Sequence, residues 1–252
     1  MQINPQLYNI LTYGFTQDLP AYQRLAHQFG GPILDIGAGL GRISLPLLED
    51  GHSIVTIDNN PAMCSELSHS CSHLLEDVQR NIWVLEADAT TTPSLQMTPL
   101  HFGERERLPT KFATILIGLR TVHLIDPEKR EALFSWCHQH LHKEGILIIH
   151  HSSFDATKSS DIWRLVAEHP TEQGLLEIDE LFRFNPQRDR FELRHRIYQS
   201  NEMGQHIASW RVAHDLYAID LIDIQQSLAE SGFSSVKTEP LYGNDQLLIV
   251  HP

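Results

Sequence analysis

The stretch that decides the fold is "PILDIGAGLGR", which runs from Pro32 to Arg42. An apolar run typical of a short buried strand leads directly into Gly37, Gly39 and Gly41. A glycine-rich turn after a strand lets backbone N–H groups approach a ligand at the start of the next helix. Three interpretations are therefore open: a dinucleotide site, a site for another adenosyl cofactor, or a tight turn without a ligand.

The spacing of the glycines weakens the dinucleotide interpretation. The dinucleotide pattern is G-x-G-x-x-G, and its third glycine permits close packing of the helix on the strand. Here the spacing is Gly37-x-Gly39-x-Gly41, and Arg42 stands where that third glycine belongs. An NAD-dependent oxidoreductase is therefore the less favoured alternative.

Outward from this stretch, apolar segments alternate with helix-like segments. Such alternation predicts βαβ units around a mostly parallel sheet, with ligands beyond the carboxyl ends of the strands. We expect strands at 32–37, 53–58, 81–88, 111–119, 146–151, 234–239 and 246–252, and helices at 41–51, 61–80, 127–145 and 223–233.

The pattern changes after the fifth strand. Strand-like runs over 180–219 are interrupted by "NPQRD" (185–189) and "NEMG" (201–204), and both interruptions are hairpin signals. They predict an antiparallel addition of about three strands. The expected fold is therefore α/β: a Rossmann-like, seven-stranded, mostly parallel sheet with helices on both faces, plus a small antiparallel β insert.

Four segments follow from this organisation. We expect an N-terminal helical cap over 1–30, a cofactor-binding domain over 31–152 and 221–252, and an insert over 153–220 that forms part of the substrate pocket. Three prolines and several turn residues mark 89–110 as a long irregular connection.

Acidic residues stand beside the expected carboxyl ends of the first three strands. Asp35 precedes the first glycine, Asp58 ends the second strand 21 residues after Gly37, and Asp88 ends the third. A carboxylate in the place of Asp58 accepts hydrogen bonds from both ribose hydroxyls of an adenosyl group. Asp88 is suited to accept from the exocyclic amine of adenine. Together with the glycine turn, these acids favour an adenosyl cofactor over a turn without a ligand.

Composition narrows the class of protein. The 252 residues include 19 basic and 32 acidic side chains, for a net charge of −13. This balance argues against a dedicated nucleic-acid binder, because phosphate contacts supply most of such affinity. Cys64, Cys71 and Cys137 have no metal or disulfide spacing, which predicts a reduced, cytoplasmic setting. We expect no signal peptide and no membrane span.

The motifs together resemble the class I S-adenosylmethionine-dependent methyltransferase family. "ILDIGAGLGR" resembles the first motif of that family, "VTIDNNPAM" (55–63) the second, "LEADAT" (85–90) the third and "FATILIGLRTVHLI" (112–125) the fourth. The resemblance covers about residues 20–150. The predicted insert resembles those between the fifth and sixth strands of small-molecule and peptide N-methyltransferases.

The resemblance implies roles for individual residues. The three glycines approach the methionine half of the cofactor, and Asp58 holds the ribose. Asn59 and Met63 flank the adenine, whose edge is read by Asp88 and the Ala89 amide. The Leu119 carbonyl receives the methionine amine, and Arg42 pairs either with the methionine carboxylate or with a surface acid.

Candidate catalytic residues follow the fourth and fifth strands. His123 and His150 have a near-neutral intrinsic pKa that suits a general base, although each is as well suited to packing. Arg120 is the best candidate for an anionic acceptor. Tyr13 and Tyr22 are candidate lid residues, with core packing as the alternative. The histidines of "CHQHLH" (137–142) alternate along an expected helix and so share no face, and no metal is expected.

The sequence therefore predicts methyl transfer from S-adenosylmethionine, with S-adenosylhomocysteine as product. The acceptor is expected on a small molecule or a peptide, with nitrogen favoured over oxygen. A protein that binds the cofactor as a scaffold or sensor without catalysis is the third alternative. A monomer and a homodimer both fit the sequence.

Overall fold

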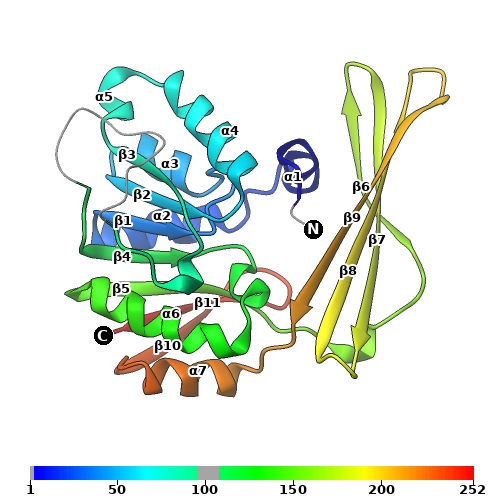
Figure 1. Cartoon of the computed structure of the whole chain (residues 1–252). Helices are drawn as coiled ribbons and strands as arrows, with labels where there is room; N and C mark the ends of the chain where they lie inside the picture. The colour runs from blue at the N-terminus through cyan, green and yellow to red at the C-terminus, as the bar shows by residue number, and fades with distance from the viewer. Residues whose placement is uncertain (1–2, 96–107) are drawn as a thin grey trace. The chain divides into compact units, whose positions relative to one another are not determined.

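The structure is a computed structural model that describes residues 3–95 and 108–252. The chain divides into two compact units (Figure 1). The larger unit comprises Gly14–Ser153 and Ile219–Pro252, and the smaller comprises the chain up to Tyr13 together with Phe154–Ala218. The segment 1–30, which we expected as one cap, is thus divided between the units. The reason is that Leu7 and Ile10 pack on the apolar cluster of the smaller unit.

The larger unit is built on a seven-stranded sheet, as predicted. Its order is β10-β11-β5-β4-β1-β2-β3, and every neighbouring pair is parallel except the two that involve β11. The chain winds from β1 outward to β3 and then returns to place β4 on the other side of β1, so the strand order reverses between β1 and β4. The strands are β1 (Ile33–Ile36), β2 (Ile54–Asp58), β3 (Ile82–Glu86), β4 (Phe112–Ile117), β5 (Leu141–Ser152), β10 (Ser235–Pro240) and β11 (Asp245–His251).

Helices cover both faces of this sheet. On one face α2 (Leu19–Phe29), α3 (Ser44–Glu49) and α4 (Pro61–Ser72) pack against alternate strand residues in one apolar cluster. The intervening strand residues, such as Leu147 and Ile149, are also completely buried. The second face of the sheet, to which these residues point, is covered by α6 (Pro127–His140) and α7 (Leu221–Glu230), which contact each other (Figure 1). A sheet buried on both faces explains why its strands read as continuous apolar runs.

Two expected boundaries were wrong. The helix predicted over 127–145 ends at His140, and β5 begins at Leu141. Gly145 therefore does not end a helix but lies in β5 beside an irregularity in the β4–β5 pairing, where a Cβ would lie 2.8 Å from the Ala113 carbonyl oxygen. The helix predicted over 61–80 is broken into α4 and α5 (Glu76–Gln79).

The smaller unit is an antiparallel sheet of four strands rather than about three. Its order is β6-β7-β8-β9, and both predicted hairpins are present. The sequence analysis missed β6, whose mostly exposed residues, RLVAEHPT, show no alternation of apolar and polar side chains. Helix α1 (Pro5–Thr12) contributes apolar residues to the same unit. The strands are β6 (Arg164–Thr171), β7 (Gly174–Asn185), β8 (Arg190–Ser200) and β9 (His206–Tyr217), preceded by η3 (Ala156–Lys158).

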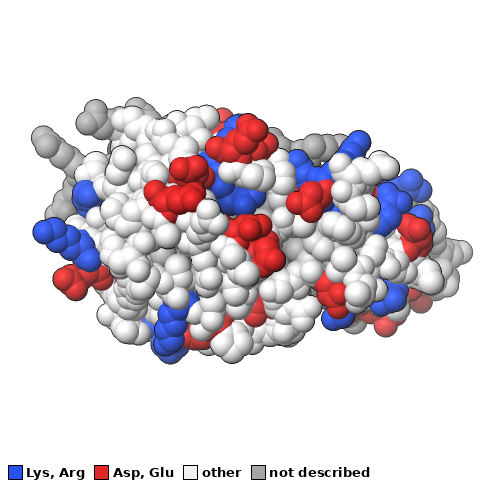
Figure 2. Space-filling view, turned by 90° about the horizontal axis from the view of Figure 1, so that it is seen from below, with Lys and Arg blue, Asp and Glu red and all other residues white. Residues whose placement is uncertain are grey.

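Part of the long connection 89–110 is described. A short 3-10 helix, η1 (Ala89–Thr91), follows β3, and residues 96–107 lie outside the described residues. In the described ranges, no helix is long and apolar enough to cross a membrane. On the face drawn in Figure 2, acidic and basic side chains lie in small groups of both signs, separated by uncharged surface.

Candidate functional site

The candidate site lies where β1, β2, β3 and β4 end. These four strands are adjacent and parallel, so the turns that follow them meet at one edge of the sheet. This edge includes the point between β1 and β4 where the strand order reverses. Open α/β sheets bind their ligands at such a point.

The turn after β1 requires its glycines. Gly37, Gly39 and Gly41 have φ values of +72°, +57° and +79°, which side-chain-bearing residues rarely adopt. A Cβ on Gly37 would lie 2.5 Å from Cγ2 of Thr121, and a Cβ on Gly41 would lie 2.7 Å from Cδ1 of Leu67. Gly37 and Gly41 are thus required because neighbouring side chains leave no room for a Cβ. The contact of Gly37 with Thr121 also places the turn after β1 against the turn after β4.

Asp58 joins the glycine turn to the end of β2. Its Oδ2 accepts a hydrogen bond from the Gly39 backbone N–H at 2.8 Å, and its Oδ1 accepts one from the Asn60 N–H at 2.9 Å. Burial raises the pKa of Asp58, and backbone hydrogen bonds from Asn60, Gly39 and Asn59 work in the opposite direction. A carboxylate offers about four lone-pair sites. Three donors from the chain leave capacity for about one more, and acceptance from the two ribose hydroxyls stays a prediction.

The two residues expected beside the adenine differ in exposure. Asn59 is exposed at the edge of the sheet, directly after Asp58. Met63 is buried, with 3% of its surface exposed, and lies on α4. The N-cap of α4 is the buried Asn60, whose side chain accepts from the Ala62 N–H at 3.1 Å. Met63 therefore lies in the protein interior in this structure.

Asp88 organises the turn after β3. Its Oδ1 accepts hydrogen bonds from the Thr90 N–H at 2.9 Å and from the Thr90 hydroxyl at 2.6 Å, so it acts as the N-cap of η1. Ala89 is buried beside it. The structure thus places Asp88 and Ala89 at the predicted edge of the sheet, and reading of an adenine by these residues stays a prediction.

Asp35 is a buried acid inside β1. It is 2% exposed, and its Oδ2 accepts a hydrogen bond from the Ser44 hydroxyl at 2.6 Å. Burial raises the pKa of Asp35 to about 6, although the Ser44 hydrogen bond and the Arg42 charge act in the opposite direction. Asp35 is therefore held below the surface by α3.

The turn after β4 has unusual backbone geometry. Leu119 and Arg120 have φ values of +23° and +61°, and the turn continues into η2 (Thr121–Leu124). Non-glycine residues in this region are uncommon and strained. Arg120 Nε donates to the Ser152 hydroxyl at 3.2 Å, and its guanidinium lies 3.7 Å from Asp245. The side chain is about one-third exposed, and its proposed contact with an anionic acceptor stays a prediction.

His123 is not placed to act as a general base. It is completely buried, and its Nε2 accepts a hydrogen bond from the Ser152 backbone N–H at 3.0 Å. The lone pair of Nε2 is therefore committed to β5. This bond explains why a histidine lies in η2: it fixes the turn after β4 to the end of β5.

His150 is also completely buried, which argues against direct contact with an acceptor. The Tyr22 hydroxyl lies 3.2 Å from its Nδ1, and Oδ2 of Asp245 lies 3.2 Å from its Nε2. Tyr22, which we considered as a lid, is itself completely buried in the core. The alternative role of core packing is therefore the one found for Tyr22.

Arg42 pairs with an acid of the chain. Its two terminal nitrogens each lie 2.7 Å from an oxygen of Asp18, which is completely buried. Its guanidinium also lies over the ring of Phe15, 5.0 Å from the centroid. The bidentate geometry fixes the side chain in place. The sequence analysis missed Asp18 and Asp245, because neither lies in a motif or at the carboxyl end of a parallel strand.

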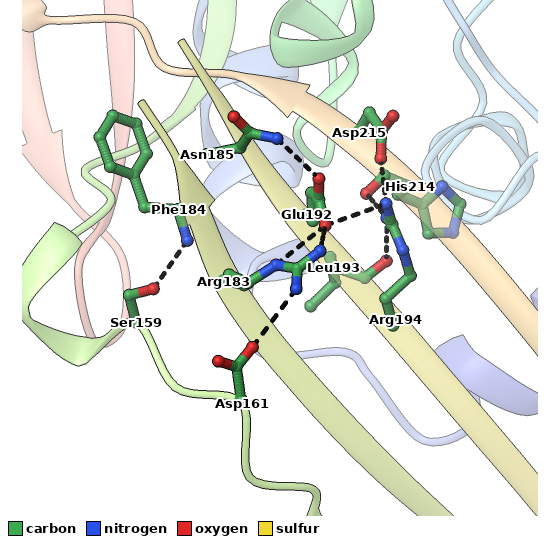
Figure 3. A network of polar contacts seen from close by, with 10 residues as sticks. All are labelled: Ser159, Asp161, Arg183, Phe184, Asn185, Glu192, Leu193, Arg194, His214 and Asp215. Atoms are coloured by element: carbon green, nitrogen blue, oxygen red, sulfur yellow. Dashed lines mark hydrogen bonds and ion pairs between the residues drawn. The ribbon is translucent and has the colours of Figure 1, made fainter. Parts of the chain in front are cut away.

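The remaining candidates belong to the smaller unit. Tyr13 is 69% exposed, and its ring meets His169 edge-on at 5.0 Å. In the same unit, Arg183 of β7 and Arg194 of β8 take part in a network of charges (Figure 3). Arg183 pairs with Asp161 and Glu192, and Arg194 pairs with Glu192 and Asp215. Hydrogen bonds from Asn185 and Arg183 lower the pKa of Glu192. These charges are thus compensated within the sheet.

The cysteines form neither a disulfide nor a metal site in the described residues. The thiols of Cys64, Cys71 and Cys137 are free and buried, and burial raises the pKa of each. Within residues 3–95 and 108–252, no group of three metal-ligating side chains is found.

A protein-family comparison matches the part of the chain that contains the turns after β1, β2, β3 and β4. The family described as "Methyltransferase domain" matches residues 33–145, which include the glycine turn, Asp58, Asp88 and the turn after β4. Residues 33–145 are therefore similar to a methyltransferase domain. No curated protein matches the sequence.

Solved structures show the same fold over almost the whole chain. DesVI from Streptomyces venezuelae is 12% identical, with a TM-score of 0.74 and 100% of each chain covered. The sugar N-methyltransferase KedS8 from Streptoalloteichus sp. is 14% identical, with a TM-score of 0.70 and coverage of 99% of this chain and 92% of that one. The glycopeptide N-methyltransferase MtfA, complexed with S-adenosylmethionine, is 17% identical, with a TM-score of 0.60 and coverage of 92% and 86%. Likeness at these identities shows the fold of the methyltransferase domain.

Replacement of Gly37 by alanine tests the contact between the two turns. We expect Gly37→Ala to lower the free energy of unfolding by about 1–3 kcal/mol, through its left-handed backbone and its contact with Thr121. Adding Thr121→Ser removes Cγ2 and should restore part of the loss. Urea unfolding of the four members of the double-mutant cycle measures this coupling. Purely additive effects would contradict the contact.

The raised pKa of Asp35 predicts a pH-dependent stability. The folded chain holds this proton more tightly than the unfolded chain, so Asp35 lowers stability as pH rises from about 4 to about 6, and the loss persists above that range. The variant Asp35→Asn lacks this loss. It should be more stable than the parent at pH 7, by up to about 3 kcal/mol, and the difference should vanish below pH 4.

Denaturant unfolding between pH 4 and pH 7 measures that difference. Asp77→Asn is the matched control, because Asp77 is exposed on α5. A difference between Asp35→Asn and the parent that does not change with pH would contradict the raised pKa of the buried carboxyl.

Proposed function

We propose that the protein is an S-adenosylmethionine-dependent methyltransferase. The observation that carries the proposal is the Asp58–Gly39 hydrogen bond, which sets an acid of β2 beside the glycine turn where the strand order reverses. This arrangement offers backbone N–H groups and one carboxylate to an adenosyl group. The match of residues 33–145 to a methyltransferase family and the complexes of MtfA support the same cofactor.

The residues present fit the parts of that cofactor. When bound, S-adenosylmethionine supplies an activated methyl group on a sulfonium. Asp58 has acceptor capacity for a ribose hydroxyl, and the exposed Asn59 follows it directly. Asp88 and the Ala89 amide lie at the end of β3, beside β2, on the side assigned to adenine. The Leu119 carbonyl lies on the opposite side, after β4, and is assigned to the methionine amine.

We favour an amine of a small molecule or a peptide as the acceptor. Two of the similar structures are described as a sugar N-methyltransferase and a glycopeptide N-methyltransferase. In the reaction the nitrogen lone pair forms the N–CH₃ bond while the S–CH₃ bond breaks, its electron pair stays on sulfur, and the nitrogen then releases a proton. Holding nitrogen and methyl in line is worth several kcal/mol.

The burial of His123 and His150 bears on which group removes the proton of the acceptor. The internal bonds of His123 and His150 leave neither of them facing an acceptor. We therefore assign the reaction to the neutral form of the amine, whose lone pair needs no base. An oxygen acceptor would need a base to remove its proton, which is a further reason to favour nitrogen. Contribution of the antiparallel unit to the substrate pocket stays a prediction.

Calorimetric titration tests the cofactor assignment. We expect S-adenosylmethionine and S-adenosylhomocysteine to bind with micromolar affinity and NAD to give no signal. Asp58→Ala should weaken both sulfur ligands by about 10–100-fold, the value of a hydrogen bond to a charged group. Asp77→Ala removes an exposed acid from α5 and should leave affinity unchanged.

Three outcomes separate the alternatives. Binding of NAD in place of the sulfur ligands would refute the proposal in favour of an oxidoreductase. Silence toward the sulfur ligands would refute it outright. Binding without release of S-adenosylhomocysteine across a panel of amines would favour the scaffold or sensor alternative.

A further inference from the structure

A buried chain of polar side chains links α2, β5 and β11 to the turn after β4. Its members are Tyr22, His150 and Asp245, of which the first two are completely buried and the third is 6% exposed. The Tyr22 hydroxyl lies 3.2 Å from His150 Nδ1, and His150 Nε2 lies 3.2 Å from Asp245 Oδ2. All three belong to the larger unit.

Both ends of the chain lie beside the same turn. A Cβ on Gly118, directly before Leu119, would lie 3.8 Å from the Tyr22 oxygen. At the other end, Asp245 forms an ion pair with Arg120. A path of three side chains therefore runs from Gly118 to Arg120, with His150 between Tyr22 and Asp245.

Asp245 is a strong end point for this path. Its Oδ2 lies 3.7 Å from the Arg120 guanidinium. Burial raises the pKa of Asp245, but hydrogen bonds from His150 and Ser152, with the charge of Arg120, hold it well below its usual range. The carboxylate therefore stays ionised, and His150 is held between it and Tyr22.

The path ends at the part of the backbone that most needs support. Leu119 and Arg120 both have positive φ, and such strain persists only where surrounding contacts over-determine it. A buried polar chain is a costly way to fill a core, since apolar side chains of the same volume often stabilise a protein as well or better. Its presence here points to a requirement for this backbone conformation rather than for stability alone.

The position of the turn indicates what that requirement is. Thr121 touches Gly37, so the turn after β4 borders the glycine turn on the side away from Asp58 and β2. With the ribose at Asp58, the adenine lies toward β2 and β3, and the amino-acid half of the cofactor extends over β1 and β4. We infer that Tyr22, His150 and Asp245 are positioning residues that hold the Leu119–Arg120 turn in the conformation that receives the amino-acid half of S-adenosylmethionine. The inference rests on the proposed function.

A pair of ligands tests this inference. S-adenosylhomocysteine carries the amino-acid half, whereas 5′-methylthioadenosine keeps the adenosine and the sulfur but lacks the amine and carboxylate. Tyr22→Phe removes the hydroxyl and retains the ring. We expect calorimetry to show about tenfold weaker binding of S-adenosylhomocysteine, as for one lost hydrogen bond, with binding of 5′-methylthioadenosine unchanged within twofold.

Two further variants keep the test decisive. Thr114→Val removes a buried hydroxyl that donates to the Gly30 carbonyl at 3.0 Å, at the opposite end of β4, and should change neither affinity. Asp245→Asn retains the shape of the carboxylate at the end of the chain and should reproduce the selective loss. It decides the question if Tyr22→Phe does not fold.

Each result has one meaning. A selective loss for S-adenosylhomocysteine supports the positioning role. Equal losses for both ligands, or no loss for either, would overturn it, because a purely structural role does not distinguish the halves of the cofactor. Failure of the unmodified protein to bind S-adenosylhomocysteine would instead overturn the proposed function.

Discussion

The hydrogen bond from the Gly39 N–H to the Asp58 carboxylate is the constraint around which the site is arranged. It joins the turn after β1 to the end of β2, two strands whose parallel register is already fixed by Ile33 opposite Ile54. The turn can reach Asp58 only because its glycines accept positive φ. Sheet register, backbone freedom and one carboxylate thus define the place at which we propose that an adenosyl group binds.

The opposite side of the site depends on buried polar groups rather than on glycine. His123 accepts a hydrogen bond from the Ser152 backbone, the Tyr22 hydroxyl lies beside His150, and Asp245 lies on the other side of the His150 ring. These groups hold the turn after β4, where Leu119 and Arg120 are strained. Arg42 and Asp18 add a bidentate ion pair near the glycine turn. A rigid floor of this kind suits a reaction that depends mainly on the alignment of donor and acceptor.

Local sequence signals predicted the sheet but not the partners within it. Apolar runs and the "GAGLG" turn located β1 to β4, and the interruptions "NPQRD" and "NEMG" located two hairpins, because these features act over a few residues. The end of α6 was misplaced, since Gly145 serves a close contact with Ala113 and not a helix end. Strand β6 lacks an apolar alternation and was missed.

The candidate residues also divide into those that local sequence located and those whose surroundings come from distant parts of the chain. Asp58 and Asp88 are placed by the ends of their own strands, so the sequence located them. His123, His150 and Tyr22 were considered for catalysis or as a lid because of their chemistry, yet contacts more than 20 residues distant in sequence bury them. Asp245 has no local signal at all. Its importance comes from the antiparallel pairing of β11 with β5, which sets it opposite Ser152.

A crystal structure of the protein with S-adenosylhomocysteine tests the central claim most directly. The account predicts the ligand across the carboxyl ends of β4, β1 and β2, with a ribose hydroxyl within hydrogen-bonding distance of the Asp58 carboxylate and the amino-acid group beside Leu119. A ligand bound at any other edge of the sheet, or one whose ribose lies away from Asp58, would contradict it.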